Sequence, residues 1–178
     1  KTGIEVIPNG VDRSVITKKD PSYVKSRYQL TPPVFGYVGS LESWIDLESI
    51  VELWPQIKRR YINASLLIVG PDLHTDYAER LKELVKRRGL SEDIKFTGQI
   101  TYENLGHYIS AMDIGLNPRK DIKMNTLTMG SKILNYLACG VPVLSNNMPA
   151  ARERFGEEEG VFVYENPDDF LCKIYYAL

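Results

Sequence analysis

Four basic side chains and one glycine lie within residues 117–132, whose sequence is NPRKDIKMNTLTMGSK. They are Arg119, Lys120, Lys123, Gly130 and Lys132. The segment leads from an apolar run into a helical pattern, and the backbone N–H groups at a helix N-terminus attract anions. Lysine and arginine add charge-assisted hydrogen bonds to phosphate oxygens. The pattern indicates a phosphate or diphosphate site, although a charged loop that only faces solvent would have the same composition.

Glycines stand where several apolar runs end. Gly39 is followed by Ser40, Gly98 by Gln99, and Gly70 closes a third run. Because glycine has no side chain, a ligand can approach backbone N–H groups at these points. A simple turn explains each glycine equally well, so the glycines alone are weak support for a ligand site.

Several other chemistries lack the residues they need. No G-x-G-x-x-G follows the first apolar run and no G-x-x-x-x-G-K-[ST] occurs, which excludes a dinucleotide fingerprint and a P-loop. His74 and His107 have no cysteine or carboxylate at metal-ligand spacing, so we expect surface or capping roles for them. No G-x-S-x-G hydrolase elbow is present either. The sequence therefore predicts no metal site.

The overall charge argues against a nucleic-acid partner. The 178 residues include 22 Lys and Arg against 23 Asp and Glu, a net charge of −1. Such a balance offers no general attraction for a polyanion, which would have to meet a local cluster. One basic run, Lys86 to Arg88, suits the C-terminus of a helix, whose dipole favours cations. We expect no nucleic-acid binding.

Cysteine usage and hydropathy favour a cytoplasmic protein. Cys139 and Cys172 both lie in apolar helical patterns, where a buried thiol is expected rather than a disulfide. No apolar run approaches the roughly 20 residues that span a bilayer, and no signal peptide opens the chain.

Six short apolar runs must supply the elements that position the basic segment. They are VFGYVG (34–39), SLLIVG (65–70), DIKFTG (93–98), DIGLNP (113–118), VPVLSN (141–146) and GVFVYE (160–165). Nearly continuous apolar character is typical of strands that are buried on both faces of a parallel sheet.

Longer amphipathic segments alternate with these runs. In residues 40–54 we expect a helix capped by Ser43 and ended or kinked by Pro55. In residues 75–90 an apolar stripe ends before Gly89, a helix-stop signal. Further helices are expected in 101–112, before Cys139, in 147–155 and in 167–178, with Leu134, Leu137 and Ala138 packing on the sheet.

This alternation predicts an α/β fold with a doubly wound, mostly parallel, Rossmann-like sheet. Ligands of such sheets bind beyond the carboxyl ends of the strands, where the strand order switches. The basic segment and the glycines all follow strands, so the fold would bring them to one edge.

Five segments of the chain resemble, in order, the C-terminal half of GT-B glycosyltransferases, in particular the retaining group known as family 4 or glycosyltransferase group 1. The segments are VIPNGVD (6–12), GYVGSLESW (36–44), LLIVGP (66–71), IKFTGQITYENLGHYISAMDIGLNP (94–118) and MGSKILNYLACGVPVLS (129–145). The resemblance covers nearly the whole chain.

This resemblance implies a domain organisation and a set of partners. Residues 13–178 would bind a nucleotide-diphosphate sugar, UDP-, GDP- or ADP-linked, and residues 1–12 would link them to an absent N-terminal acceptor domain. The expected reaction is glycosyl transfer to a glycan or lipid-linked acceptor with retention of configuration, as in polysaccharide biosynthesis, with no cofactor and no metal. Any membrane contact would come through the absent half.

The resemblance also implies roles for glycines at the strand ends. Gly39 and Ser40 resemble the glycine loop near the donor phosphates. Gly98 and Gln99 resemble the strand end beside the nucleotide base. Gly130 resembles the glycine whose backbone approaches the diphosphate and the sugar.

Four further residues take donor roles by the same resemblance. Lys132, next to Ser131, resembles the lysine of a subgroup with the pattern K-l-x-E-Y-L-A-x-G-x-P-V, and Asn135 takes the place of its ribose-binding glutamate. Lys132 first and Arg119 second would stabilise the departing diphosphate. Lys132 and Asn135 would share one helix face because they are three residues apart.

Two departures from the family pattern leave alternatives open. The family's two glutamates correspond here to Leu127 and Asn135, so Asn125 would have to supply the sugar-hydroxyl contact. No Lys or Arg lies between Gly39 and Ile57, where relatives place phosphate-binding residues. A catalytically degenerate nucleotide- or sugar-binding partner module, or a doubly wound domain with an unrelated ligand, would also fit these departures.

Overall fold

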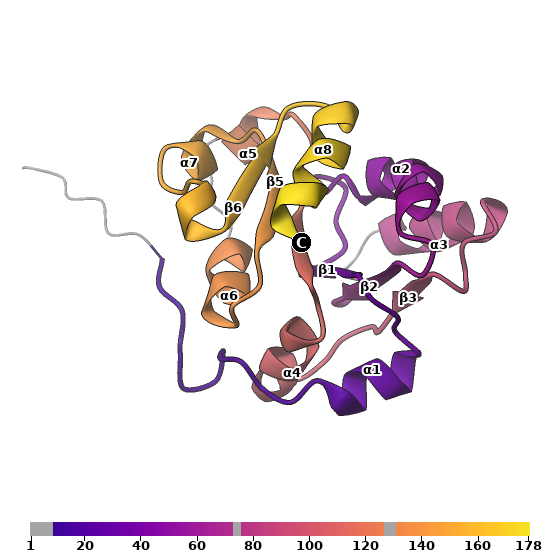
Figure 1. The fold of residues 1–178 in the computed structure, drawn as a ribbon, viewed down its shortest axis with the longest axis horizontal. Helices are drawn as coiled ribbons and strands as arrows, with labels where there is room; N and C mark the ends of the chain where they lie inside the picture. The colour runs from indigo at the N-terminus through magenta and orange to yellow at the C-terminus, as the bar shows by residue number, and fades with distance from the viewer. Residues whose placement is uncertain (1–8, 73–75, 127–130) are drawn as a thin grey trace, which may run out of the picture.

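The fold is a single parallel sheet between two layers of helices (Figure 1). The computed structural model describes residues 9–72, 76–126 and 131–178. Within them, six strands follow the order β3-β2-β1-β4-β5-β6, and every pairing is parallel. The strands are β1 (Val34–Val38), β2 (Ser65–Val69), β3 (Ile94–Phe96), β4 (Ile114–Asn117), β5 (Val143–Asn146) and β6 (Val161–Tyr164). The predicted doubly wound, Rossmann-like sheet is confirmed.

The helices divide between the two faces of the sheet. One apolar cluster joins the sheet to α2 (Leu47–Arg60), α3 (Tyr77–Arg87) and α8 (Pro167–Ala177). The other joins it to α1 (Ser22–Tyr28), α4 (Leu105–Ser110), α6 (Lys132–Ala138) and α7 (Pro149–Arg152). The remaining short helices are α5 (Lys123–Thr126) and the 3-10 turns η1 (Tyr102–Asn104) and η2 (Glu157–Glu159). Helix α1 was not predicted.

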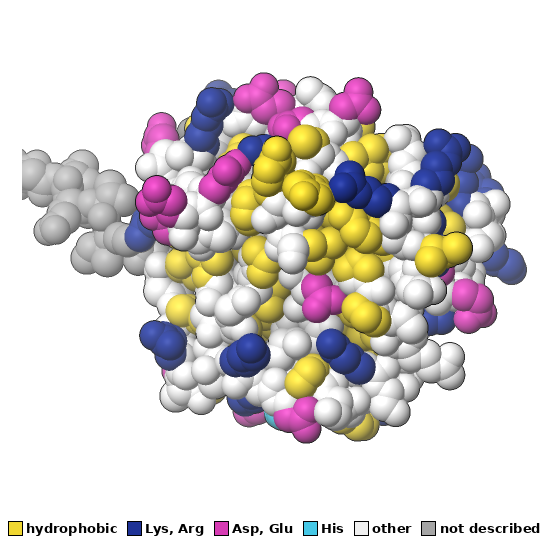
Figure 2. All heavy atoms as spheres, viewed as in Figure 1, with side chains coloured by type: hydrophobic (Ala, Val, Ile, Leu, Met, Phe, Trp, Pro, Cys, Tyr) yellow, Lys and Arg dark blue, Asp and Glu magenta, His cyan; other side chains and the backbone are white. Residues whose placement is uncertain are grey.

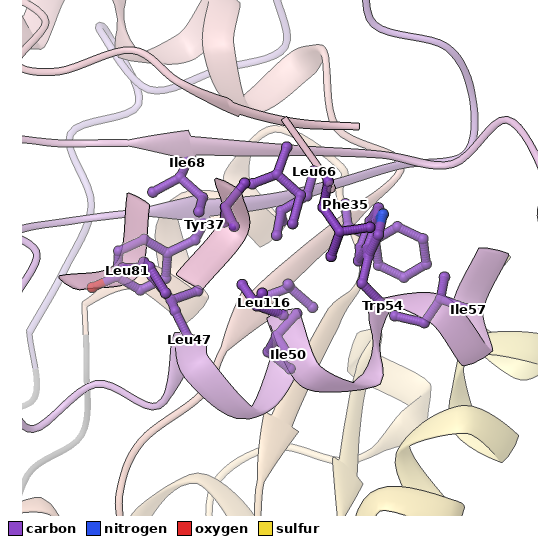
Figure 3. Packing of buried hydrophobic residues seen from close by; sticks show 14 of the residues in the cluster. Phe35, Tyr37, Leu47, Ile50, Trp54, Ile57, Leu66, Ile68, Leu81 and Leu116 are labelled. Atoms are coloured by element: carbon purple, nitrogen blue, oxygen red, sulfur yellow. The ribbon is translucent and has the colours of Figure 1, made fainter. Parts of the chain in front are cut away.

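Alternate side chains of β1 enter the two clusters. Phe35 and Tyr37 face α2, whereas Val34 and Val38 face the opposite cluster. Figure 3 shows Phe35 beside Trp54 of α2, and their rings meet nearly edge-on with centroids 5.5 Å apart. Full burial of such a side chain contributes about 1.5–3 kcal/mol. Burial on both faces explains why the strands read as continuous apolar runs.

Helix α2 begins later and ends later than predicted. Asp46, not Ser43, is its N-cap, and the Asp46 carboxylate accepts from the Ser49 N–H at 3.4 Å. Pro55 does not end the helix, which continues to Arg60. The Pro55 ring is exposed, while Trp54 and Ile57 on either side are buried. Their burial offsets the roughly 3 kcal/mol that proline costs inside a helix.

Two predictions about helix faces need correction. In α6 the buried residues are Ile133 and Tyr136, not Leu134, although Leu137 and Ala138 pack partly against the same cluster. Cys139 is buried as predicted, but Cys172 is exposed, because it lies on the outer face of α8. A short apolar helix does not fix its buried face by composition alone.

The surface has no continuous basic band on the face that Figure 2 shows, where acidic and basic side chains are interspersed. Apolar side chains gather beside α8, where Tyr175 and Tyr176 are exposed. No helix among the described residues is long and apolar enough to cross a membrane.

Candidate functional site

The site lies at the carboxyl edge of the sheet, where β1 and β4 separate. These strands pair through Phe35 with Ile114 and Gly36 with Gly115. The chain leaves β1 towards β2 on one side and β4 towards β5 on the other, so the strand order switches between them. Ligands of doubly wound folds bind at such a switch point. Helix α6 begins here, with Lys132 as its first residue.

Lys132 reaches across the end of β1. Its Nζ lies 5.2 Å from the centroid of the Tyr37 ring. Its Cε is so close to Gly39 that a Cβ built on that glycine would lie 2.4 Å from it. Gly39 also has φ +141°, a conformation that favours glycine. The structure thus brings together Lys132 and Gly39, which the sequence assigned to one phosphate site.

Burial and a neighbouring charge both act on Lys132. Burial first, and the charge of Arg119 second, lower the pKa of Lys132 to about 8. Burial also lowers the pKa of Arg119, and Tyr37 opposes this effect. No carboxylate of the described residues lies within salt-bridge distance of Lys132. Two cations thus lie near each other at the switch point, and an incoming anion would relieve their repulsion.

The backbone of Arg119 is fixed by two neighbouring segments. Its N–H donates to Asn146 Oδ1 at 3.2 Å, and Asn146 Nδ2 donates to the Arg119 carbonyl. Ile45, in the loop after β1, forms an antiparallel bridge with Arg119. The loop after β1, the loop after β4 and the end of β5 therefore meet at Arg119.

Asn125 is a buried part of the same loop, with 1% of its surface exposed. Its Nδ2 donates to the carbonyls of Trp44 at 2.9 Å and Lys120 at 2.8 Å, and its Oδ1 accepts from Arg119 Nη1 at 3.5 Å. Through these hydrogen bonds, Asn125 links the Arg119 side chain to the backbone of Trp44 and Lys120. Its contact with a sugar hydroxyl stays a prediction.

Lys120, the neighbour of Arg119, faces a different environment. Its Nζ lies 3.4 Å from Glu48 Oε1 and 5.4 Å from the centroid of the Tyr77 ring. Glu48 in turn accepts a hydrogen bond from the Tyr77 hydroxyl at 2.5 Å. The charge of Lys120 is therefore balanced within the fold, which makes Lys120 a weaker phosphate candidate than Lys132.

Helix α6 presents Lys132 and Asn135 one turn apart, as predicted. Ser131 precedes the helix, is exposed, and makes no side-chain cap. Asn135 is half-buried, and within the described chain no hydrogen bond engages its side-chain amide. An amide both donates and accepts, so Asn135 has the groups that a ribose diol needs. Gly130 and Leu127 lie outside the described residues.

Tyr136 anchors α6 in the gap between β1 and β4. Its hydroxyl accepts from the Val38 N–H at 2.8 Å and donates towards the Leu116 carbonyl at 3.2 Å. Its ring covers Gly115, where a Cβ would lie 2.5 Å from the ring. Sequence reasoning missed this role. A tyrosine inside an apolar helix, together with a glycine inside an apolar strand, was the available signal.

A small pocket of about 190 Å³ lies beside Gly39 on the α4 side. Its lining residues are mostly apolar and are Val38, Gly39, Val69, Gly70, Pro71, Ile100, Thr101, Tyr102 and Leu105. The predicted base-side pair, Gly98 and Gln99, is exposed and directly precedes these lining residues. Gly98 still shapes the rim, because its carbonyl accepts from the Gly70 N–H at 3.1 Å. No sequence pattern pointed to Ile100, Thr101 and Tyr102 as lining residues of a pocket.

A larger pocket, of about 630 Å³, lies at the opposite edge of the sheet, near Pro33, Asp113 and Cys139. Pro33 and Asp113 directly precede β1 and β4, and Cys139 follows α6. The pocket therefore lies at the amino ends of the strands, where parallel sheets do not usually bind ligands. The larger pocket is therefore not the candidate site, and we place the candidate at the switch point, where Lys132 and Arg119 lie.

The sequence comparisons identify the family of the chain. The family model for glycosyl transferases group 1 matches residues 19–178. A GDP-mannose-dependent monoacylated alpha-(1-6)-phosphatidylinositol monomannoside mannosyltransferase of Corynebacterium glutamicum is 26% identical over 181 residues, covering 98% of this chain and 46% of the relative. The chain thus spans less than half the length of this relative.

Solved structures that share this fold include one from Anabaena and one from Francisella tularensis. Anabaena Alr3699/HepE in complex with UDP-glucose has a TM-score of 0.78 at 20% identity, covering 97% of this chain and 46% of that protein. The C-terminal domain of a glycosyl transferase group 1 family protein (LpcC) from Francisella tularensis has a TM-score of 0.75 at 18% identity, covering 93% and 86%. At these identities the likeness establishes the fold. Because the family model spans most of the sequence, the chain belongs to the group 1 glycosyl transferase family.

Proposed function

We propose that this domain binds the diphosphate of a nucleotide sugar at the switch point between β1 and β4. Lys132 and Arg119 would neutralise the diphosphate, and the backbone of Gly39 would allow its close approach. The observation that carries this proposal is the Lys132 ammonium over the end of β1, against Gly39 and within the field of Arg119. Two neighbouring cations suit a dianionic ligand, because charge-assisted hydrogen bonds to phosphate oxygens are strong.

The pocket beside Gly39 is suited to the nucleotide base. It is mostly apolar and opens next to the proposed phosphate site, and Tyr102 offers an aromatic surface. Asn135, on the other side of Lys132, would contact the ribose hydroxyls. The Corynebacterium relative is named for GDP-mannose, and the Anabaena structure holds UDP-glucose. We therefore propose the class of nucleotide-diphosphate sugars without choosing the base or the sugar.

Catalysis in this proposal comes from stabilising the leaving group. As the bond between the sugar and the diphosphate breaks, negative charge grows on the diphosphate. Lys132 and Arg119, held by their neighbours before the reaction, would stabilise that charge more in the transition state than in the ground state. The proposal uses no side-chain nucleophile. It also needs no metal, because two side-chain cations balance the diphosphate.

The whole protein would transfer the sugar to a glycan or lipid-linked acceptor, with retention of configuration. The acceptor would bind an N-terminal domain, to which residues 1–12 would connect, and the two domains would form a GT-B enzyme. Relatives more than twice as long as this chain support that architecture. Membrane contact, if the acceptor is a lipid, would involve that domain, and the proposed location is cytoplasmic.

Calorimetric titration with UDP, GDP and ADP tests the proposal. We expect one nucleotide to bind, and binding to none of them would contradict it. The degenerate-module alternative is not favoured, since the named relatives are transferases. It would regain support if the nucleotide bound but the full-length protein never cleaved a donor.

A further inference from the structure

The position of Lys132 raises the question of what holds a lysine in a cationic site. Its four-carbon stem is flexible, and the nearby charge of Arg119 repels it. Elsewhere in the described chain a lysine is held by a carboxylate, as Lys58 is by Asp93 at 2.8 Å. Lys132 has no such partner in the described ranges, so another group must fix its ammonium.

We propose that Tyr37 is a positioning residue of the donor site, whose ring holds the Lys132 ammonium over the end of β1 while leaving its N–H groups available to the diphosphate. The inference rests on the proposed function. Lys132 Nζ lies 5.2 Å from the ring centroid, within the range of a cation–π interaction. The lysine stem passes Gly39, so the ring and the glycine together define its path.

The Tyr37 ring is a fixed support. It is fully buried, and Figure 3 shows it within the apolar cluster that contains Leu47 and Leu81. Its hydroxyl donates to the Ser40 carbonyl at 2.9 Å, which ties the ring to the loop after β1. Because the Tyr37 ring is fixed by its packing and its hydrogen bond, the Lys132 ammonium takes the position that the ring favours.

An aromatic ring has a chemical advantage over a carboxylate at this position. A carboxylate would accept the ammonium N–H groups and would have to be displaced when the diphosphate arrives. The ring attracts the cation through its quadrupole and leaves those donors for phosphate oxygens. Lys120 provides the contrast, because it contacts both a ring and Glu48.

The groups that face Lys132 also predict a signature in the pH dependence. Arg119, from the loop after β4, disfavours the charged lysine, whereas the ring of Tyr37, from β1, favours it. Burial raises the pKa of the Tyr37 hydroxyl, Arg119 opposes this shift, and Glu42, from the loop after β1, adds to it. Weakening the ring's attraction would lower the pKa of Lys132 further, so nucleotide affinity would begin to fall at a lower pH.

The test uses whichever of UDP, GDP and ADP binds the wild-type protein, and measures its binding to the full-length protein by calorimetry from pH 7 to pH 10. Tyr37→Phe keeps the ring and should stay within about threefold of the wild-type affinity, whereas Tyr37→Leu should lose about threefold to tenfold. Tyr37→Phe with increasing numbers of ring fluorines keeps the shape and reduces the ring's attraction. Affinity should fall stepwise with fluorination, and the pH at which it declines should move down.

Tyr164→Leu is the matched control. Tyr164 packs edge-on against Phe170, with centroids 4.9 Å apart, in the same apolar cluster, and no lysine lies on its ring among the described residues. It should lower the melting temperature but leave the affinity for that nucleotide and its pH profile unchanged. Equal nucleotide affinity across the fluorinated series would overturn the role of Tyr37 and leave the proposed function intact. Failure of the wild-type protein to bind UDP, GDP or ADP would instead remove the proposed function.

Discussion

Lys132 is the residue on which the proposed chemistry depends most. It combines burial, a neighbouring cation and close contact with a glycine at the switch point. A lysine in such surroundings is costly for the free protein, because its charge is partly desolvated. Binding of a diphosphate would reverse that cost, so occupancy and the charge of Lys132 should be coupled.

Lys132→Ala should weaken nucleoside diphosphate binding more than tenfold, or by about 1.4 kcal/mol or more, because a charge-assisted contact is lost. Calorimetry with the nucleotide that binds the wild-type protein measures the change. Lys86→Ala, an exposed lysine near the end of α3, serves as the control and should bind normally. An unchanged affinity in Lys132→Ala would move the phosphate site elsewhere.

The affinity should also depend on pH. Because the pKa of Lys132 is lowered to about 8, the lysine is charged at pH 7 and loses its proton as the pH rises through 8. The charged form binds the diphosphate, so affinity should be constant near pH 7 and fall above pH 8. Titrations at half-unit steps up to pH 10 measure this decline. Lys132→Arg keeps its charge throughout this range, and a similar decline in that variant would rule out Lys132 as its origin.

A negative charge at position 135 should change the affinity for the nucleotide. Asn135→Glu is expected to tighten nucleotide binding, because a carboxylate accepts hydrogen bonds from ribose hydroxyls about twice as strongly as a neutral amide. Comparing UDP with its 2′-deoxy analogue localises the effect, since the gain should shrink when the hydroxyl is absent. Weaker binding by the glutamate variant would mean that Asn135 makes another contact.

At the scale of elements, α6 carries the site and Tyr136 holds α6. The helix has only seven residues, too few to be stable alone. Its position therefore depends on Ile133 and Tyr136, which are fully buried against the sheet. The Tyr136 hydroxyl also satisfies the Val38 N–H, which the separating strands would otherwise leave unpaired.

Tyr136→Phe should lower the free energy of unfolding by about 1–3 kcal/mol, because the buried Val38 N–H loses its acceptor. Urea denaturation followed by circular dichroism measures this change. Tyr108→Phe, in a tyrosine whose ring packs against Tyr28, should cost less. If the two variants were equally stable, the hydroxyl of Tyr136 would not be the anchor.

At the scale of the whole molecule, this domain supplies one wall of the proposed reaction site. We expect the full-length protein to hydrolyse or transfer a sugar from the nucleotide sugar whose nucleotide binds this domain, and Lys132→Ala to reduce kcat strongly because leaving-group stabilisation is lost. Nucleotide release, followed by a coupled assay, is the measurement. A protein that binds the nucleotide but never releases it from a donor would favour the degenerate module.

The sequence determined the strands and the doubly wound sheet, because continuous apolar runs can be buried only between two layers of helices. The resemblance to GT-B glycosyltransferases placed Gly39 and Lys132 near the same phosphates, and the structure brings these two residues together. The sequence pattern misplaced the start of α2 and the buried face of α6, because Ser43 and Asp46 are both good caps and a seven-residue helix offers several apolar stripes.

Only the tertiary structure decided which groups act on Lys132. The contacts with Tyr37 and Arg119 join residues far apart in the chain, and no local pattern reports distances across a sheet. The same holds for Tyr136, whose hydroxyl fills a gap between two strands, and for Ile100 to Tyr102, which line a pocket one residue beyond the predicted pair. Sequence periodicity indicates the buried face of a long element, but packing decides the buried face of a short one and what each buried or half-buried side chain meets.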